Sequence, residues 1–387
     1  MASAISGRRG AFACLLAGTA LAGIFAGAPA ASAADPTFAP AASYFTGSIS
    51  GPGPAPVGSV TADWDNDGDA DLATVDLTSL SGPIAQLNNG DGEFPTKKTV
   101  SGAIGVQALA AGDVTGDGRA DLVGMTISSI VIMRGNGNGT FSVVRSFSAT
   151  LGGQLNPILG DFDEDGDLDI AAPTFTYIQT WKNNGSGGFT VGPPAQPQGA
   201  GVMSAITKAK INADGHIDLY AVDGLFGRIY ALTGNGDGTF NSTGNLPLVG
   251  FIPEDVAAGD LNGDGFDDVG AVGSFSFTLA TGLADGSGGF ATSSQLQFGG
   301  AGPTSLAIAD FNRDGNKDVV VSDVANPLRP AMVMFTGDGT VKPKRTGSFV
   351  VTAFPQTPVV ADYDRDGRLD IATHGPLRAS VLINRTP

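Results

Sequence analysis

Three features of the sequence predict an all-β fold, and more narrowly a seven-bladed β-propeller with four-stranded blades. An acidic motif recurs seven times, at intervals of 48 to 52 residues. Between the motifs lie glycine-rich turns that end in Phe or Val. The chain has 58 glycines among 387 residues and few long apolar runs of the kind that form helices.

The acidic motif has a fixed frame of nine residues, which sets the period of the repeat. Its copies begin, in chain order, at Asp63, Asp113, Asp161, Lys210, Asp260, Asp310 and Asp362. Position 5 is Asp, position 6 is Gly and position 9 is Asp in all seven copies, and position 3 is Asp, Asn or Thr. A frame that recurs at this interval is typical of one structural unit per copy.

Each unit is expected to contain four short strands. In the second unit these are residues 106–113, which run into the acidic motif, 121–125, which leave it, 129–135, which enter the glycine turn, and 140–147, which follow it. Gly and Asn in these turns tolerate the positive φ of tight hairpins. The turns end at Phe94, Phe141, Phe189, Phe240, Phe290 and Val341.

The two ends of the chain predict how the ring closes. After the seventh motif the sequence stops at Pro387, before any fourth strand. Phe38 resembles the Phe of the glycine turns, and it lies 25 residues before Asp63, against 19 to 21 residues elsewhere. A Pro/Gly insertion at residues 51–56 accounts for the excess. We therefore expect the N-terminal strand to complete the last blade, which leaves no open sheet edge in the ring.

Residues 1–34 are interpreted as a secretion signal and residues 35–387 as a single propeller domain. Arg8 and Arg9 precede a short apolar run, and residues 31–33 offer the small side chains that signal peptidase requires. A retained membrane anchor is the alternative, which the short Ala/Gly-rich run disfavours. Cys14 lies in this segment, so the mature chain would have no disulfide. We expect a secreted, extracellular monomer that is not inserted in a membrane, exported by the general or the twin-arginine route.

The acidic motifs predict calcium sites. Oxygen side chains at alternate positions, with a Gly bend at position 6, let a short loop wrap a hard cation, with the carbonyl of position 7 as a further ligand. Calcium fits such a set better than magnesium, because its coordination is rich in oxygen and lenient in geometry. The expected metal-binding residues are Asp63, Asp65, Asp67, Asp69, Asp71, Asp113, Thr115, Asp117, Arg119, Asp121, Asp161, Asp163, Asp165, Asp167, Asp169, Asn212, Asp214, His216, Asp218, Asp260, Asn262, Asp264, Phe266, Asp268, Asp310, Asn312, Asp314, Asn316, Asp318, Asp362, Asp364, Asp366, Arg368 and Asp370.

An EF-hand and a solvated acidic turn are the alternatives to this interpretation. An EF-hand needs Glu at position 12, where the seven copies have Thr, Gly, Ala or Val, and it needs helices on both sides. Acidic surface turns without a metal would not explain a fixed frame in seven copies. The calcium interpretation therefore stands.

The seven copies are not expected to bind calcium equally. The loops from Asp63 and Asp161 carry five carboxylates in frame and the loop from Asp362 carries four, so these should bind most tightly. The loop from Asp113, which contains Thr and Arg, should be weaker. In the fourth copy Lys210 takes position 1, where its ammonium would occupy or repel the cation position. We expect about six sites, with the fourth loop free of metal or very weak.

Charge and hydrophobicity of the motifs narrow the possible partners. The chain has a formal net charge of −17, and 27 of its 38 acidic residues lie in the motifs, so nucleic acid is disfavoured as a partner.

Position 2 of the motif is always apolar, and these residues are interpreted as anchors that pack between blades. They are Trp64, Val114, Phe162, Ile211, Leu261, Phe311 and Tyr363.

The acidic loops, the G-D-G-x-F turns and the seven units resemble the FG-GAP/VCBS repeat proteins, a family that includes the propeller of integrin α-subunits. The resemblance covers essentially the whole mature chain. It implies that positions 1, 3, 5 and 9 bind calcium through side chains and position 7 through its carbonyl, and Lys210 departs from that pattern. Similar propellers serve as adhesion modules, as lectins that bind sugars between blades and as domains of polysaccharide lyases, so the resemblance does not identify the function.

The sequence favours binding over catalysis. It has two histidines, His216 in a metal loop and His374 after a strand, and no G-x-S-x-G motif. The loops away from the acidic motifs carry aromatic side chains and Arg, at residues 175–177, 223–228, 273–277 and 325–330. These side chains either form a recognition surface for carbohydrate or protein, or pack between blades. We expect an extracellular recognition or adhesion module, with a polysaccharide lyase or another secreted carbohydrate-active enzyme as the alternative.

Overall fold

The computed structural model describes residues 34–45, 58–75, 82–149, 156–248, 252–273, 276–297, 302–324, 330–351, 355–375 and 378–387. These residues belong to one compact unit, Ala33–Pro387. Within the described ranges the chain forms strands and turns but no helix, and so none that could cross a membrane. The predicted secretion signal lies outside the described residues apart from Ala34, as does the Pro/Gly insertion at 51–56.

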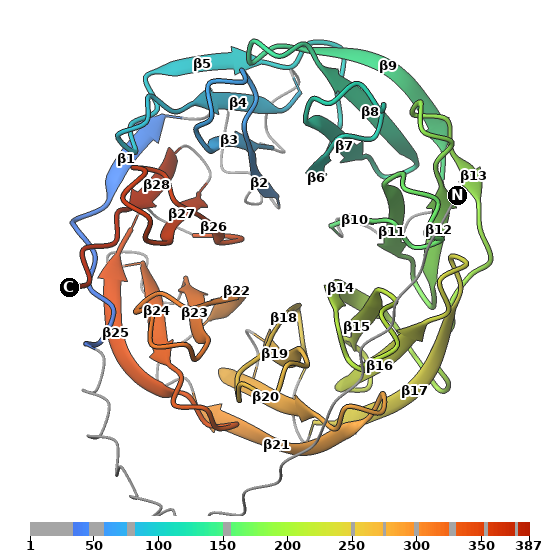
Figure 1. Cartoon of the computed structure of the whole chain (residues 1–387), viewed down its shortest axis with the longest axis vertical. Coiled ribbons are helices and arrows are strands. Elements are labelled where there is room, and N and C mark those ends of the chain that lie inside the picture. The colour runs from blue at the N-terminus through green and yellow to red at the C-terminus, as the bar shows by residue number, and fades with distance from the viewer. Residues whose placement is uncertain are drawn as a thin grey trace, which may run out of the picture. The chain divides into compact units, whose positions relative to one another are not determined.

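The strands form seven antiparallel sheets of four strands each, which surround a common centre as the blades of a propeller (Figure 1). Blade 1 contains β2 (Ser59–Ala62), β3 (Asp71–Thr74), β4 (Ile84–Leu87) and β5 (Thr96–Thr99). Blade 2 contains β6 (Ala108–Gly112), β7 (Asp121–Met125), β8 (Ser129–Gly135) and β9 (Phe141–Ser148). Blade 3 contains β10 (Ile158–Gly160), β11 (Asp169–Pro173), β12 (Ile178–Lys182) and β13 (Thr190–Val191).

In blades 1 to 3 the strands follow one another from the centre outward, and the next three blades have the same order (Figure 1). Blade 4 contains β14 (Met203–Ala209), β15 (Asp218–Asp223), β16 (Arg228–Gly234) and β17 (Phe240–Pro247). Blade 5 contains β18 (Asp255–Gly259), β19 (Asp268–Gly273), β20 (Thr278–Ala284) and β21 (Phe290–Gln297). Blade 6 contains β22 (Pro303–Ala309), β23 (Asp318–Asp323), β24 (Ala331–Thr336) and β25 (Lys344–Val350). The predicted seven-bladed all-β fold is confirmed.

The seventh blade closes the ring with strands from both parts of the chain. It consists of β26 (Val359–Ala361), β27 (Asp370–His374), β28 (Arg378–Leu382) and β1 (Ala42–Phe45). β1 pairs with β28 so that Ala42 lies opposite Val381, and Phe38 forms an isolated bridge with Asn384. The N-terminal strand therefore completes the last blade, as predicted from the position of Phe38.

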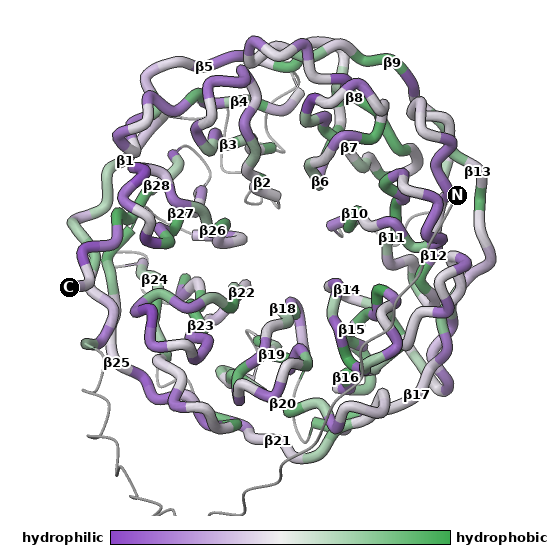
Figure 2. Tube along the Cα trace, viewed as in Figure 1, coloured by the Kyte–Doolittle hydropathy of each residue, from purple (hydrophilic) through white to green (hydrophobic). Residues whose placement is uncertain are grey.

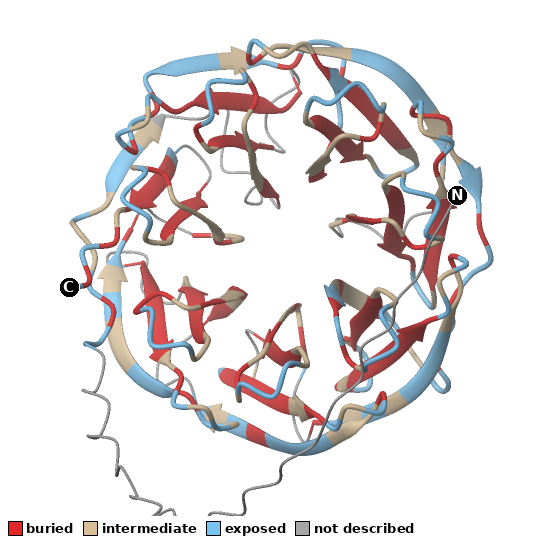
Figure 3. Cartoon of the chain, viewed as in Figure 1, coloured by how far each residue is buried: buried red, intermediate tan, exposed pale blue. Residues whose placement is uncertain are grey.

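Burial changes from the inside of each blade to its outer edge (Figure 3). All five residues of β7 are buried, whereas β9 at the rim of the same blade is largely exposed. Figure 2 shows the matching pattern, with hydrophobic stretches inside the blades and hydrophilic ones along the turns. The middle strands read as near-continuous apolar runs because neighbouring blades cover both of their faces.

The core of the described residues consists of seven apolar clusters, one between each pair of neighbouring blades. The residue at position 2 of every acidic motif is at most 3% exposed and belongs to the cluster shared with the following blade. Trp64, for example, packs edge-on against Phe141, which ends the glycine turn of blade 2, with the ring centroids 5.3 Å apart. The predicted role of these residues as anchors between blades is confirmed.

Candidate metal centres

The seven acidic loops lie at the same end of the blades, because each joins the innermost strand to the second strand. The first loop leaves β2 after Ala62 and enters β3 at Asp71. In each blade the Asp of position 9 is the first residue of the second strand. A rigid sheet therefore holds the last acidic side chain of every loop in place.

The Asp at position 1 folds the loop around its own carboxylate. In the first loop Asp63 accepts hydrogen bonds from the backbone N–H groups of Asp67, at 3.2 Å, and Gly68, at 3.0 Å. The same two bonds, from positions 5 and 6, occur in every copy with Asp at position 1. Backbone amides that converge on a carboxylate stabilise its charged form.

Two residues in each such loop adopt a left-handed backbone. Position 6 is Gly with positive φ in all seven copies, which only glycine adopts without strain. Position 4 also has positive φ in six copies, where it is Asn66, Gly116, Glu164, Gly263, Arg313 and Arg365. Position 4 has no common residue type, so the sequence pattern does not mark it. The exception is the fourth loop, where Ala213 has no positive φ.

The Asp at position 9 clamps the loop to the blade. Asp71 accepts a hydrogen bond from the backbone N–H of Trp64 with one carboxylate oxygen, at 2.8 Å, and from the N–H of Asn88 with the other, at 2.7 Å. The equivalent pair of bonds is present in all seven blades. These Asp residues are at most 1% exposed, so position 9 has a structural role even in the loop that begins with Lys210.

Burial makes the negative charge of position 9 unfavourable without a cation. It raises the pKa of the Asp71, Asp318 and Asp370 carboxyls to about 7, although the backbone amides act in the opposite direction. It raises the pKa of Asp169 and Asp268 to about 6 for the same reason. A bound cation would favour the ionised forms.

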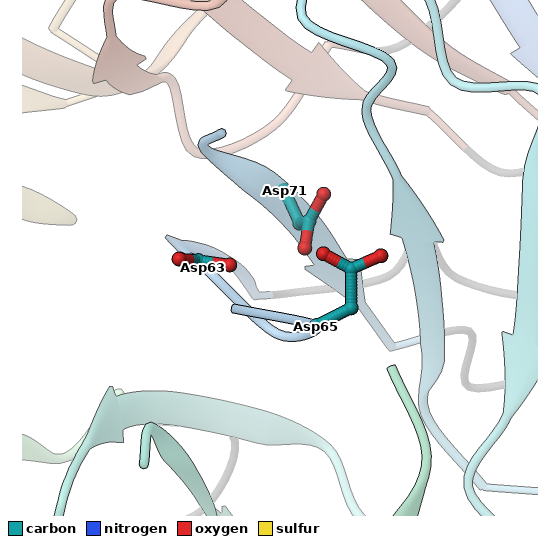
Figure 4. Close-up of side chains that lie close together, drawn as sticks. All are labelled: Asp63, Asp65 and Asp71. Carbon is teal, nitrogen blue, oxygen red and sulfur yellow. The ribbon is translucent and has the colours of Figure 1, made fainter. Parts of the chain in front are cut away.

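Three loops bring three carboxylates together. In the first loop, one oxygen each from Asp63, Asp65 and Asp71 lies within 4.8 Å of the others (Figure 4). The corresponding residues of the third and seventh loops form equivalent groups, Asp161 with Asp163 and Asp169, and Asp362 with Asp364 and Asp370. These triads could hold a metal ion, and they are the loops in which the sequence predicts the tightest binding.

Unpartnered oxygens at position 3 show where an ion would fit. Oδ1 of Asp65 and Oδ1 of Asp163 are buried, and neither accepts a hydrogen bond. A buried acceptor without a partner is unfavourable by about 1 to 3 kcal/mol, so such atoms call for an additional ligand. The donor set is made of hard oxygens, which suits calcium.

The remaining predicted ligands take different places. The Asp at position 5 lies outside the triads, and in all seven loops its Oδ1 accepts a hydrogen bond from the backbone N–H of position 7. In the fifth and sixth loops position 3 is Asn, and its amide donates to the carboxylate at position 5, at 2.8 Å and 3.0 Å. Position 3 therefore decides whether a third carboxylate joins the cluster.

Cations from neighbouring segments accompany two of the three triads. Lys182 Nζ lies 3.2 Å from Asp163, and an Arg385 nitrogen lies 2.8 Å from Asp364. Asp65, in the first loop, is not in an ion pair among the described residues, although Arg365 pairs with Asp69 of the same loop. The first triad is therefore the one whose charge the protein itself compensates least.

The fourth loop is organised differently. Lys210 directs its ammonium away from its own loop, donating to the Gly265 carbonyl of the fifth loop at 3.0 Å. The Lys210 backbone N–H also donates to Asp267, at 2.8 Å. The ammonium therefore does not occupy the cation position of its own loop, and Lys210 links two blades. That it repels a cation and that the fourth loop binds no metal remain predictions.

Each of the two histidines contacts a residue of a neighbouring blade. His216 contacts Glu164 of the third loop, with 2.5 Å between Nδ1 and Oε1. His374 is fully buried and its Nδ1 contacts the hydroxyl of Ser59 across the seam between the first and last blades. Both contacts link neighbouring blades.

Several aromatic side chains singled out in the sequence are exposed. Phe175, Phe226 and Phe277 are 59%, 57% and 43% exposed. They follow the second strands of blades 3, 4 and 5, at the end of the blades opposite the acidic loops. Packing between blades, the alternative interpretation, is therefore wrong for these three residues. The segment 325–330 lies outside the described residues except for Pro330.

The repeats are similar to a known family. Residues 161–221 and 210–271 match the FG-GAP-like repeat family. The chain therefore carries FG-GAP-like repeats. No curated protein is similar enough in sequence to match the chain.

Solved structures share the fold at low sequence identity. An Agrocybe aegerita lectin, described as recognising non-reducing terminal N-acetylglucosamine, is 19% identical, with a TM-score of 0.54 over 76% of this chain and 79% of the lectin. A streptogramin B lyase is 15% identical, with a TM-score of 0.58 over 89% of this chain and 98% of the lyase. BBS1N, in its complex with ARL6DN, is 12% identical, with a TM-score of 0.57 over 90% of this chain and 98% of the other. At these identities the likeness shows the fold alone.

Proposed function

We propose that this chain, with its FG-GAP-like repeats in a seven-bladed propeller, is a secreted, calcium-stabilised recognition module that binds an extracellular carbohydrate or protein. The observation that carries the proposal is a group of exposed apolar side chains at the end of blades 3 to 5 opposite the acidic loops. We call this group the apolar rim. It consists of Phe175, Val202, Leu225, Phe226, Ile252 and Phe277, which are 39% to 60% exposed.

The segments that carry the apolar rim in blades 3 and 4 contact each other. The backbone N–H of Met203 in blade 4 donates to the Phe175 carbonyl in blade 3, at 3.1 Å. The Phe226 ring lies so close to Gly201 that a side chain there would clash with it. Apolar side chains that gather at one place on a surface, with large aromatic members, are typical of interaction sites.

Asp223 holds the centre of the rim in place. Its buried carboxylate accepts hydrogen bonds from the backbone N–H groups of Gly201, Val202, Leu225 and Phe226, at 2.6 to 3.2 Å. One side chain thus fixes both the entry to β14 and the turn after β15. A pre-organised surface loses less conformational entropy when a partner binds.

Phe277 is held exposed by its backbone. Its φ is 50°, in the left-handed region that a bulky side chain rarely adopts. Its backbone N–H donates to the Gly273 carbonyl, at 3.1 Å. Unusual backbone conformations of this kind cluster at functional sites, which supports a binding role for this residue.

Calcium is proposed for the acidic loops with a structural role. Asp63, Asp65 and Asp71, with their equivalents in the third and seventh loops, would hold the ion, which would neutralise their charges and tie the loop to the blade. The loops and the apolar rim lie at opposite ends of the strands. The metal would therefore act by stabilising the scaffold that presents the rim.

The test is a binding screen of the purified chain in calcium against polysaccharides and extracellular proteins, with ultraviolet absorbance followed in parallel. We expect saturable binding of at least one ligand, and a loss of tenfold or more when both Phe175 and Phe226 are replaced by Ser. Val350→Ser is the matched control, because Val350 is 58% exposed on the outer strand of blade 6. Equal loss in the control would refute the role of the rim, and rising absorbance of unsaturated sugar ends would show a lyase instead.

A further inference from the structure

A second feature lies at the inner end of the same side of the ring. A cavity of about 400 Å³ lies among β14, β18 and β22, the innermost strands of blades 4, 5 and 6, and reaches residues that precede β10 and β26. Its lining runs along most of each of these strands, and the residues before β10 and β26 contribute to it at the end opposite the acidic loops. Its volume is within the range of small-molecule sites.

The lining combines apolar walls with hydrogen-bond acceptors and negative charge. Half-buried apolar residues, Ala205, Ala257, Ala258, Ala307 and Ile308, provide most of the apolar surface. Glu254 and Asp255 also line the cavity, and its lining includes no Lys, Arg or His. A cavity lined in this way favours a cationic ligand over an anionic one.

Asp255 is a carboxyl group held in a fixed orientation in the cavity. Its carboxylate accepts hydrogen bonds from the Ser305 hydroxyl and from the backbone N–H of Leu306, the latter at 3.2 Å. Burial is the main cause that raises the pKa of this carboxyl, and the neighbouring Glu254 charge adds to it. These hydrogen-bond donors orient the carboxylate but are neutral, so a cation in the cavity would stabilise its ionised form.

Two hydroxyls of the cavity donate to neighbouring carbonyls, which leaves their oxygens free to accept. The hydroxyl of Ser204 donates to the Pro253 carbonyl, at 2.9 Å, and that of Thr304 donates to the Pro355 carbonyl, at 3.3 Å. Oδ1 of Asn156 is buried without a hydrogen-bond partner. An ammonium group brings three donors, which these hydroxyl oxygens and Oδ1 of Asn156 can accept.

We propose that this cavity binds an alkylammonium group, of the kind that a lysine side chain carries, with the ammonium near Asp255 and the alkyl chain along the apolar wall. A sugar fits less well because no aromatic side chain lines the cavity to stack on its ring. Such a group would bind whether or not the apolar rim recognises a larger partner.

The test uses two small probes of equal size and different charge. The purified full chain, saturated with calcium and at physiological salt, is titrated with n-pentylammonium and with 1-pentanol by calorimetry. We expect saturable binding of n-pentylammonium and binding of 1-pentanol that is at least tenfold weaker. Calcium keeps the acidic loops occupied, and salt suppresses attraction that depends on net charge alone.

Variants locate the binding. Glu254→Gln and Asp255→Asn should each lower the affinity for n-pentylammonium about tenfold or more, since each removes an ionisable carboxyl from the cavity. Glu93→Gln removes the same charge from an exposed turn residue in blade 1 and should change the affinity less than twofold. Equal binding of the two probes, no saturable binding of n-pentylammonium, or an equal loss in Glu93→Gln would each overturn the proposal. If Asp255→Asn fails to fold, the two probes and Glu254→Gln still decide it.

Discussion

Asp65→Asn separates the metal-binding role of the first loop from its folding role. Oδ1 of Asp65 is buried and unpartnered, and burial followed by the charges of Asp67 and Asp63 raises the pKa of its carboxyl. Asn occupies the same position in the fifth loop, where the amide of Asn262 donates to Asp264 at 2.8 Å. The substitution should therefore remove a repulsion and add a hydrogen bond to Asp67 when no metal is bound.

Asp65→Asn is expected to raise the free energy of unfolding in chelator and to lower it in calcium. In chelator, Asp65→Asn should stabilise the fold by about 1 kcal/mol, the usual contribution of one hydrogen bond. In calcium it should lose much of the stabilisation that binding at one site provides. That stabilisation is about 2.7 kcal/mol when free calcium is a hundredfold above Kd. Asp71→Asn is the comparison, because it removes one of two charge-assisted acceptors and should destabilise by about 1.5 to 3 kcal/mol even in chelator.

Thermal unfolding of the two variants and the parent chain, each in calcium and in chelator, tests this pair of expectations. For a unit of this length 1 kcal/mol corresponds to about 1 to 2 °C in Tm. Asp65→Asn should raise Tm slightly in chelator and lower it in calcium, and Asp71→Asn should lower it in both. If Asp65→Asn lowered Tm in chelator, or if calcium raised the Tm of this variant as much as that of the parent chain, the assignment of Asp65 as a ligand would be refuted.

Three further predictions concern pH, the core and the fourth loop. In chelator, stability should rise as pH falls from above 7 toward 4, because the position 9 carboxyls of five loops have pKa values of about 6 to 7 in the folded state and about 3.9 when unfolded. This gain should largely vanish in calcium, and a Tm in chelator that does not change across this pH range would contradict the prediction. Trp64→Ala should destabilise by about 3 to 5 kcal/mol in urea unfolding, since Trp64 is 2% exposed between two blades; a change under 1 kcal/mol would show that it is no anchor. Lys210→Ala should lower Tm by a degree or two in calcium and chelator alike, through loss of the Gly265 contact; an effect confined to calcium would show instead that Lys210 acts on a metal.

The frame of the acidic motif was sufficient to predict most of the fold. A period near fifty residues and the repeat of Phe38 predicted both the blades and the closure of the ring, because these depend on local patterns that recur. The same frame predicted that the loops from Asp63, Asp161 and Asp362 carry the most carboxylates, and the structure gathers three in each of them. Side-chain type at fixed spacing was enough for this part of the site.

Other features depend on contacts between blades and could not be predicted. The direction of the Lys210 ammonium depends on the position of the neighbouring loop, and the exposure of Phe226 depends on how Gly201 and Asp223 hold its turn. The left-handed backbone at position 4 left no common residue type in the sequence. The cavity beside Asp255 is formed by strands about fifty residues apart, so no local motif marks it.

The melting temperature of the purified chain as a function of free calcium tests the central claim most directly. Three triads saturated at a hundredfold excess over Kd would together contribute about 8 kcal/mol, so Tm should rise by roughly 10 °C between chelator and saturating calcium. Superimposable unfolding curves in chelator and in calcium would contradict the assignment of the acidic loops as metal centres.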